Sequence, residues 1–348
     1  MSTAFPLPEL QRSELSGRAR GPLLVLAGPT AVGKSALAMA IARCAPGEII
    51  AADCVQVFRG LDIGTGKPSA HDRATVPHHL VDLCEPTGTF SAHEFARRAA
   101  QAVQEIRGRG RLPVLVGGTG LYLRAFLAGI LAGSGANPAL REQLRQEAQA
   151  LGTPALFERL RAADPESAAR IHPQDLVRIV RALELAHATG RRPSAWRTRL
   201  WDPPRVPDTL MLVLTRERDE LSVLINTRAR QMWEGGLLEE VRGLLARGYA
   251  ADLRPLQAIG YRQAVAVLQG ELSAAEGLLS MQRATRQYAK RQLTWYRREP
   301  AAEWVTVRGW AWVEPLALEI LERLARRTEP PGSAGGASPD GRHPASAH

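Results

Sequence analysis

Lysine is almost absent from this sequence of 348 residues, although lysine and arginine together number 45. The only lysines are Lys34, Lys67 and Lys290, so arginine supplies nearly all of the positive charge. A lysine that remains in such a composition is a candidate for a position that needs a compact ammonium group. Lys34 and Lys67 both lie in glycine-flanked segments, which agrees with this interpretation.

Cysteine, long apolar runs and a leader-like N-terminus are also scarce or missing. Cys44, Cys54 and Cys84 lack the spacing of metal ligands, which favours reduced thiols over a zinc site. No apolar run is long enough to span a bilayer. Residues 1–20 carry acidic residues and no apolar core, unlike a secretory signal. The sequence therefore predicts a cytoplasmic protein without membrane contact.

The charge balance is strongly basic, with a formal net charge of +10. A polyanionic partner is the natural inference, and nucleic acid comes ahead of a membrane surface. The alternative is an arginine-rich composition with no specific partner. Charge alone does not decide between the two.

Short apolar runs, each ending in turn-forming or polar residues, alternate with helical patterns over most of the chain. Strands that alternate with helices predict a parallel α/β sheet flanked by helices. The expected strands are residues 22–28, 47–53, 112–118 and 209–215, and the expected helices between them include residues 35–44 and 91–110.

From about Asn137 to Trp196 the pattern predicts helices only. Segments that open at Asn137, Thr153 and Asp164 each show a capping residue followed by proline, which is typical of a helix start. This stretch indicates an all-helical module inserted between strands of the sheet. We therefore expect a disordered N-terminus at 1–20, an α/β core at 21–133 and 205–325, a helical insertion at 134–204 and a disordered tail at 326–348.

One glycine-rich segment, "GPTAVGKS" at residues 28–35, matches G-x-x-x-x-G-K-[ST] between an apolar strand and a helix. In such a loop, backbone N–H groups and the helix N-terminus bind phosphate oxygens, the lysine neutralises the terminal phosphate, and the hydroxyl binds Mg²⁺. The predicted diphosphate-binding residues are Gly28, Pro29, Thr30, Ala31, Val32, Gly33, Lys34 and Ser35, with Ser35 as the Mg²⁺ ligand.

The motif does not identify the ligand. A nucleoside triphosphatase also needs an apolar strand that ends in Asp or Glu. The best candidate strand here ends in Gly117, Gly118 and Thr119, and no guanine-reading N-K-x-D motif occurs. A transferase with diphosphate as its leaving group fits as well as an ATPase does.

Asp53 ends the expected strand 47–53 and would face the phosphate loop across the carboxyl edge of the sheet. There it could accept a proton from an attacking nucleophile. The alternative is an aspartate that caps a turn.

Seven segments resemble, in order and spacing, those of the tRNA dimethylallyltransferases (tRNA isopentenyltransferases) of the bacterial type, over residues 22 to 300. They are "GPTAVGKSALA", "DCVQVFRGLDIGTGKPS", "PHHLVDLCEPTGTFSAHEF", "LPVLVGGTGLYLRAFLAGI", "RIHPQDLVRIVRALE", "AIGYRQA" and "ATRQYAKRQLTWYRR". The resemblance implies a P-loop NTPase-like fold. It also implies transfer of the dimethylallyl group from dimethylallyl diphosphate to N6 of adenosine 37 in tRNA, by an enzyme expected to be a monomer.

The resemblance also implies residue roles. Asp53 takes the proton of the amine, Thr119 lies near the reacting groups, and Arg218 is a further diphosphate ligand. Lys34, the loop amides and Mg²⁺ would stabilise the leaving diphosphate. The target base must leave its stack to reach such a site.

The helical insertion is implied to hold the anticodon stem-loop, whose exposed bases suit sequence reading. Arg178 and Arg181, which share one helix face, have a second interpretation as solvated charges. The aromatic residues of the cationic segment 281–299 are equally well interpreted as core residues. The implied tRNA-binding residues are Asp53, Cys54, Val55, Gln56, Thr119, Arg141, Val177, Arg178, Ile179, Val180, Arg181, Gln257, Gly260, Tyr261 and Arg262.

Three positions depart from the family pattern. Cys54 replaces a usual serine, Val177 a common glutamine, and Leu224 a frequent arginine, so a diphosphate contact is either missing or supplied by Arg216 or Arg218. Two other hypotheses stay open at this point, an ATP-dependent small-molecule kinase and a non-catalytic RNA-binding protein with a vestigial loop.

Overall fold

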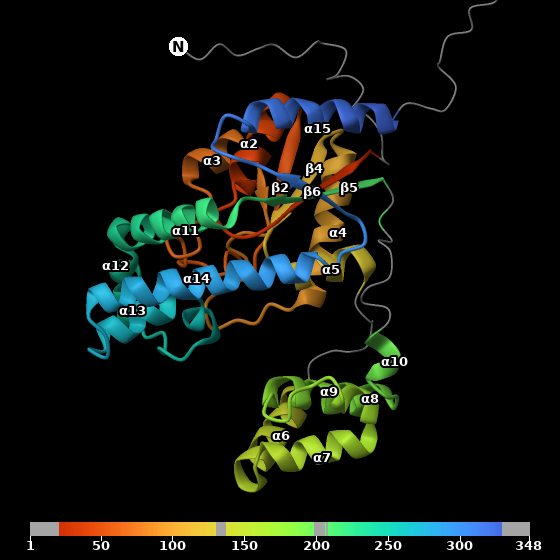
Figure 1. The fold of residues 1–348 in the computed structure, drawn as a ribbon, viewed down its shortest axis with the longest axis vertical. Coiled ribbons are helices and arrows are strands. Elements are labelled where there is room, and N and C mark those ends of the chain that lie inside the picture. The colour runs from red at the N-terminus through yellow and green to blue at the C-terminus, as the bar shows by residue number, and fades with distance from the viewer. Residues whose placement is uncertain (1–20, 130–136, 198–205, 207, 329–348) are drawn as a thin grey trace, which may run out of the picture.

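A six-stranded parallel sheet forms the centre of the protein (Figure 1). The computed structural model describes residues 21–129, 137–197, 206 and 208–328. The strands lie in the order β3-β2-β4-β1-β5-β6. Their bounds are β1 Leu23–Ala27, β2 Gly47–Ala52, β3 His78–His79, β4 Leu112–Gly117, β5 Thr209–Thr215 and β6 Ala302–Thr306.

The four central strands confirm the strands expected from the apolar runs, whereas the edge strands β3 and β6 were not predicted. All residues of β1 are buried, as is typical of a central strand covered on both faces. Leu24 and Leu26 point to one side of the sheet, and Leu23 and Val25 point to the other. Two apolar cores therefore lie back to back across the sheet.

One face of the sheet is covered by α2 and α15, which pack on each other, and the other by α4, α5, α12, α13 and α14 (Figure 1). Helix α11 contributes side chains to both cores. The core helices have these bounds: α2 Lys34–Cys44, α3 Ala70–Thr75, α4 Ala92–Gly108, α5 Gly120–Ala128, α11 Arg218–Met232, the π-helical turn η2 Trp233–Leu237, α12 Leu238–Ala246, the 3₁₀ turn η3 Arg254–Gln257, α13 Tyr261–Leu268, α14 Ala274–Tyr296 and α15 Val313–Thr328.

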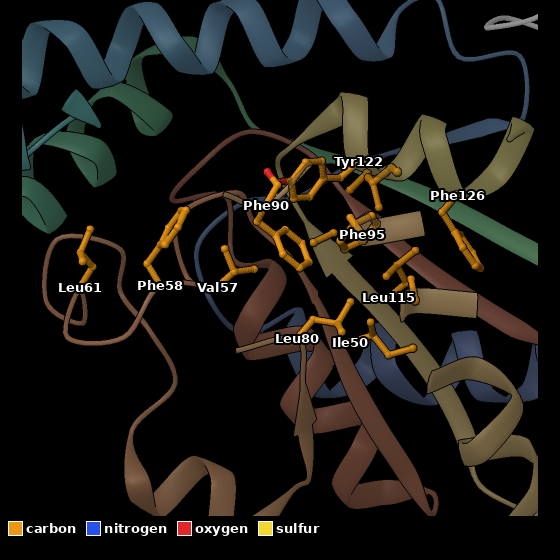
Figure 2. Packing of buried hydrophobic residues seen from close by; sticks show 14 of the residues in the cluster. Ile50, Val57, Phe58, Leu61, Leu80, Phe90, Phe95, Leu115, Tyr122 and Phe126 are labelled. Atoms are coloured by element: carbon orange, nitrogen blue, oxygen red, sulfur yellow. The ribbon is translucent and has the colours of Figure 1, made fainter. Parts of the chain in front are cut away.

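Aromatic side chains join α4 and α5 on the second face (Figure 2). The rings of Phe95 and Tyr122 stack with centroids 4.5 Å apart, and Phe90 lies against Tyr122 at 6.2 Å. Such pairs add about 0.5–1.5 kcal/mol beyond the burial of their area. This packing holds the start of α5, and with it the loop after β4, against the sheet.

The inserted helices form a separate lobe below the core in Figure 1. Asn137 and Asp164 cap their helices through side-chain oxygens, whereas α7 begins after Gly152 rather than being capped by Thr153. The lobe has its own apolar core, which includes Leu144, Leu156, Leu160, Ile179, Val180 and Leu183. Its helices are α6 Pro138–Leu151, α7 Thr153–Ala163, α8 Pro165–Ala168, α9 Leu176–Thr189 and α10 Ser194–Arg197.

At the C-terminal end of the described chain, α15 extends through Arg326 and Arg327 to Thr328, so a disordered tail from residue 326 was predicted too early. Residues 1–20 and 329–348, which were also predicted to be disordered, lie outside the described residues. Among the helices of the described part, none combines the length and apolarity needed to cross a bilayer.

Candidate functional site

The glycine-rich loop lies between β1 and α2 and curls around its own lysine. Lys34 Nζ donates hydrogen bonds to the carbonyl oxygens of Gly28 (3.0 Å) and Pro29 (2.7 Å). Gly28 has a φ of 135°, and a Cβ there would lie 2.5 Å from the Leu214 carbonyl oxygen, so only glycine fits. Burial, and next the positive charge of Arg228, lower the pKa of Lys34 to about 7.

Not every N–H group of this loop is available to a ligand. The backbone N–H of Thr30 donates to Gln292 Oε1 at 3.0 Å, and Arg228 Nη1 donates to Thr30 Oγ1 at 2.9 Å. On the outer side, Arg216 Nε donates to the Val32 carbonyl oxygen at 3.1 Å. The amide of Thr30 is therefore bonded within the protein, and its contact with phosphate stays a prediction.

Asp53 follows β2 and Thr119 follows β4, and these strands are neighbours in the sheet. Asp53 Oδ1 accepts hydrogen bonds from the backbone N–H groups of Val55 (2.8 Å) and Gln56 (3.2 Å), so it does cap a turn. Its Oδ2 accepts none from any residue that the structure describes. Thr119 Oγ1 accepts from the Cys54 N–H at 3.2 Å. One side chain can thus combine the turn cap with a free carboxylate oxygen.

Two cavities meet at Asp53, whereas Thr119 lines neither of them. One, of about 420 Å³, contains Lys34 and Ser35, and the other, of about 300 Å³, has a mainly apolar wall that includes Met232 and Met281. The residues lining both are Thr30, Asp53, Thr65, Arg228 and Tyr288.

The chemistry of the larger cavity suits a Mg²⁺ ion held jointly with a substrate. Ser35 lines it together with Lys34 and Asp53. The described residues contain no group of three or more His, Cys, Asp or Glu that would hold a metal by themselves. Mg²⁺ commonly takes one or two protein oxygens and completes its shell with phosphate and water oxygens, so Ser35 fits as the single protein ligand.

On α11, the structure places Arg228 at the site instead of Arg218, which was predicted from the sequence. Arg218, the predicted diphosphate ligand, is the exposed first residue of the helix and lines neither cavity. Arg228, which was not predicted, lies nearly three turns further on and lines both. No motif marks Arg228; only the fold brings it within reach of Thr30. Arg216 supports the loop from behind.

Lys67, the other lysine in a glycine-flanked segment, forms hydrogen bonds that hold its own loop together. Its side chain is 1% exposed, and Nζ donates to Asp62 (2.5 Å), Asp82 (2.6 Å) and the Phe58 carbonyl oxygen (2.8 Å). This ammonium fixes the loop whose Thr65 lines both cavities.

Of the predicted tRNA-binding residues near the site, several line the smaller cavity. Cys54 is exposed, yet the protein around its thiol and the adjacent Asp53 raise the pKa of Cys54 to about 11, so it is a neutral thiol at pH 7. Val55 and Gln257 line the same cavity, whereas Gln56 Nε2 donates to the Thr65 carbonyl oxygen at 3.2 Å.

The segment 257–262 is less accessible than the sequence suggested. Tyr261 lines the smaller cavity but is fully buried, and its hydroxyl donates to Glu240 Oε1 at 2.5 Å. Gly260 is also buried, and Arg262 is exposed. Tyr261 is thus built into the cavity wall.

In the helical lobe the structure separates the predicted tRNA-binding residues into two groups. Val177 is 81% exposed, and Arg178 is exposed beside Asp175, whereas Ile179 and Val180 are buried in the lobe core and cannot contact RNA. Arg141 (2.9 Å) and Arg181 (2.7 Å) both pair with Glu184, whose side chain is fully buried. These two arginines are held in place before any partner binds.

The aromatics of α14 divide in the same way. Tyr288 lines both cavities, whereas Trp295 and Tyr296 pack in the core. Arg283, Lys290 and Arg291 of this helix are exposed, and the Arg291 guanidinium lies over the Tyr288 ring, 5.8 Å from its centroid.

Comparison with known proteins finds a matching protein family and similar relatives. Residues 56–299 match the family model described as IPP transferase. A tRNA dimethylallyltransferase of Myxococcus xanthus (strain DK1622) is 52% identical over 288 residues, which cover 82% of this chain and 93% of that protein. One from Geobacter sulfurreducens is 46% identical over 285 residues, covering 81% of this chain and 91% of the relative.

Solved structures give the same picture. The tRNA isopentenylpyrophosphate transferase from Bacillus halodurans aligns with a TM-score of 0.63 at 37% identity, over 88% of this chain and 98% of that one. A structure described as a eukaryotic dimethylallyltransferase acting on tRNA aligns with a TM-score of 0.70 at 26% identity, over 82% and 74% of the two chains.

Proposed function

The chain belongs to the IPP transferase family, and we propose that it transfers a dimethylallyl group from dimethylallyl diphosphate to N6 of adenosine 37 in tRNA. One observation carries this proposal. A cationic cavity at the phosphate loop and a mainly apolar cavity meet at Asp53, which has a free carboxylate oxygen. A prenyl diphosphate combines a highly charged end with an apolar one, and this pair of cavities suits both.

On the donor side, Lys34 and Arg228 both bond to the phosphate loop and line the larger cavity, and the diphosphate would occupy that cavity beside them. Its negative charge grows as it leaves, so buried cations stabilise the transition state more than the ground state. Mg²⁺, held by Ser35 and phosphate oxygens, would add charge stabilisation of the leaving group.

On the acceptor side, the flipped adenine would enter the smaller cavity past Tyr288 and Gln257. N6 forms a bond to C1 of the dimethylallyl group while the C1–O bond breaks and its electron pair leaves with the diphosphate. Asp53 Oδ2 takes the N6 proton, because an exocyclic amine is a weak nucleophile. Thr119 Oγ1, which holds the Cys54 N–H, keeps the turn after Asp53 in place.

For RNA binding, we propose that the exposed cations of the lobe and of α14 contact phosphates. Arg178 on α9 and Lys290 and Arg291 on α14 are exposed. A net charge of +10 supports such a partner. Since tRNA resides in the cytoplasm, the reaction would take place there, with a monomer as the expected active form.

A kinase is not favoured by the family or by the smaller cavity, whose apolar wall of Met232 and Met281 suits a prenyl group and a base better than a phosphoryl acceptor.

The test is mass spectrometry of nucleosides from unmodified tRNA incubated with the protein, Mg²⁺ and dimethylallyl diphosphate. A parallel reaction contains ATP as the donor, and a tRNA without adenosine at 37 is the acceptor control. We expect prenylated adenosine only with the prenyl donor and only in tRNAs with adenosine 37. Folded protein that yields no such product would overturn the proposal.

A further inference from the structure

We propose that Gln292 is a positioning residue that fixes the phosphate loop against the loop after β4. The proposal concerns the donor subsite and rests on the proposed function. Gln292 lies on α14 and is 5% exposed, and it lines the larger cavity without belonging to the phosphate loop.

Both ends of the Gln292 amide are bonded to backbone atoms of distant segments. Oε1 accepts from the Thr30 N–H at 3.0 Å, and Nε2 donates to the Gly118 carbonyl oxygen at 2.9 Å. Because an N–H group only donates and a carbonyl oxygen only accepts, a single orientation of the amide satisfies both. Gln292 therefore sets the spacing between the loop after β1 and the loop after β4.

Each bonded partner leads directly to a residue of the site. Thr30 receives the hydrogen bond of Arg228 on its hydroxyl, so the position of Thr30 sets the position of that guanidinium. Gly118 precedes Thr119, whose hydroxyl holds the Cys54 N–H beside Asp53. The amide thereby couples the proposed donor cations to the proposed base.

The glycine at position 118 is explained by the same contact. A Cβ there would lie 2.2 Å from Gln292 Nε2, which is far inside van der Waals contact. Moving the Gln292 side chain away would break its hydrogen bonds to the Thr30 N–H and the Gly118 carbonyl oxygen. The close approach of Gly118 to the amide is a built feature of this edge of the sheet.

The same helix offers a matched control. Gln282 is 7% exposed, and its Nε2 donates to the Asn226 carbonyl oxygen on α11 at 3.2 Å. It lines neither cavity. Gln282→Met therefore removes a buried glutamine bond of the same kind without touching the donor loop.

The first measurement is equilibrium binding of inorganic diphosphate with Mg²⁺, which is independent of the acceptor reaction. We expect Gln292→Met to raise the Kd for diphosphate, and the KM for dimethylallyl diphosphate, by about tenfold, because a buried N–H and C=O lose their partners and Thr30 can shift. The Kd for tRNA should change by less than about twofold. Both variants lose hydrogen bonds of a buried amide, so Gln282→Met and Gln292→Met should lower the melting temperature by similar amounts. Only Gln282→Met should leave the diphosphate Kd unchanged.

A second variant keeps the proposal testable if methionine prevents folding. In Gln292→Glu, a neutral carboxyl group can accept from Thr30 and donate to Gly118 like the amide, whereas a carboxylate repels the Gly118 oxygen and the diphosphate. The diphosphate Kd of this variant, divided by that of wild type at the same pH, should therefore fall as pH falls. A buried carboxyl has a raised pKa, so the change is expected between about pH 5 and 8. The same ratio for Gln282→Glu should be flat.

The outcomes separate this proposal from the proposed function. If wild type binds diphosphate but prenylates no tRNA, the proposed function is wrong, and the binding data still decide the role of Gln292. If Gln292→Met and Gln282→Met change only the melting temperature, Gln292 is structural and the proposal is overturned. Unchanged or tighter diphosphate binding by Gln292→Met, or a flat pH ratio for Gln292→Glu, also overturns it.

Discussion

Replacing Asp53 by asparagine separates the two functions of one side chain. Asparagine keeps an Oδ1 acceptor for the N–H groups of Val55 and Gln56 but removes the carboxylate that would take a proton. Alanine removes both. The pair Asp53→Asn and Asp53→Ala therefore distinguishes proton transfer from support of the turn.

The magnitudes follow from these contacts. Loss of a positioned general base lowers the transfer rate by about 10² to 10⁴ in both variants. Only Asp53→Ala also loses the acceptor of two backbone hydrogen bonds, which lowers its free energy of unfolding by about 2 kcal/mol more than in Asp53→Asn. The turn carries Cys54 and Val55 into the smaller cavity, so Asp53→Ala should also weaken acceptor binding.

The assay is single-turnover transfer at saturating protein, combined with urea unfolding and the Kd for tRNA. We expect Asp53→Asn to bind tRNA within about threefold of wild type and to unfold at nearly the same urea concentration, since its turn is kept. A transfer rate for Asp53→Asn close to that of wild type would refute the role as a base. Equal loss of stability in both variants would refute the separation of the two functions.

The remaining predictions concern charged groups. Arg228→Met should lower kcat/KM for the donor by about 10² to 10³, the range for removing one electrostatic contact to a leaving group. Arg218→Met on the same helix should have almost no effect. Steady-state kinetics measure both, and a larger loss for Arg218→Met than for Arg228→Met would contradict the geometry. Because burial lowers the pKa of Lys34 to about 7 in the free protein and an anion favours its charged form, diphosphate binding at pH 8 should take up more protons in wild type than in Lys34→Met, and this difference should vanish at pH 5. Calorimetry in buffers of different ionisation heat measures this uptake, and a value for Lys34→Met equal to wild type would disprove it. Glu184→Gln should destabilise the helical lobe by about 2 kcal/mol, since two arginines lose a buried partner, without changing the diphosphate Kd. Hydrogen exchange of the amides in α6 and α9 reports this effect, and protection as in wild type would show that the pair adds no stability.

Much of the fold could be predicted because its central strands are continuous apolar runs. The strands β1, β2, β4 and β5 are buried and have that pattern. The edge strand β6 exposes Glu303 and Trp304, and β3 has two residues, so neither shows an apolar run. An edge strand has a neighbouring strand on one side only, so its sequence shows a weaker apolar pattern than that of a central strand.

The site was predictable where a local motif carries the chemistry and not where the fold assembles it. Lys34 and Asp53 stand in segments whose backbone shape is part of their function. Arg228 and Gln292 lie in helix interiors, with no signal except their distance from Thr30 in three dimensions. On α9, Ile179 and Val180 stand beside arginines in the sequence but turn toward the lobe core, because neighbours on a helix face different sides.

The points at which the helical lobe joins the core have a consequence for how such an enzyme can diverge. The chain leaves the core after Ala128 at the end of α5 and re-enters at Thr209, the first residue of β5. In a parallel sheet the strands all begin at one edge, and Asp53 and Thr119 lie beyond the opposite edge. With the RNA contacts proposed above for the lobe, mutations, insertions or exchange of the lobe would alter which RNA shapes are accepted while the reacting groups keep their spacing, so substrate range and reaction could evolve independently.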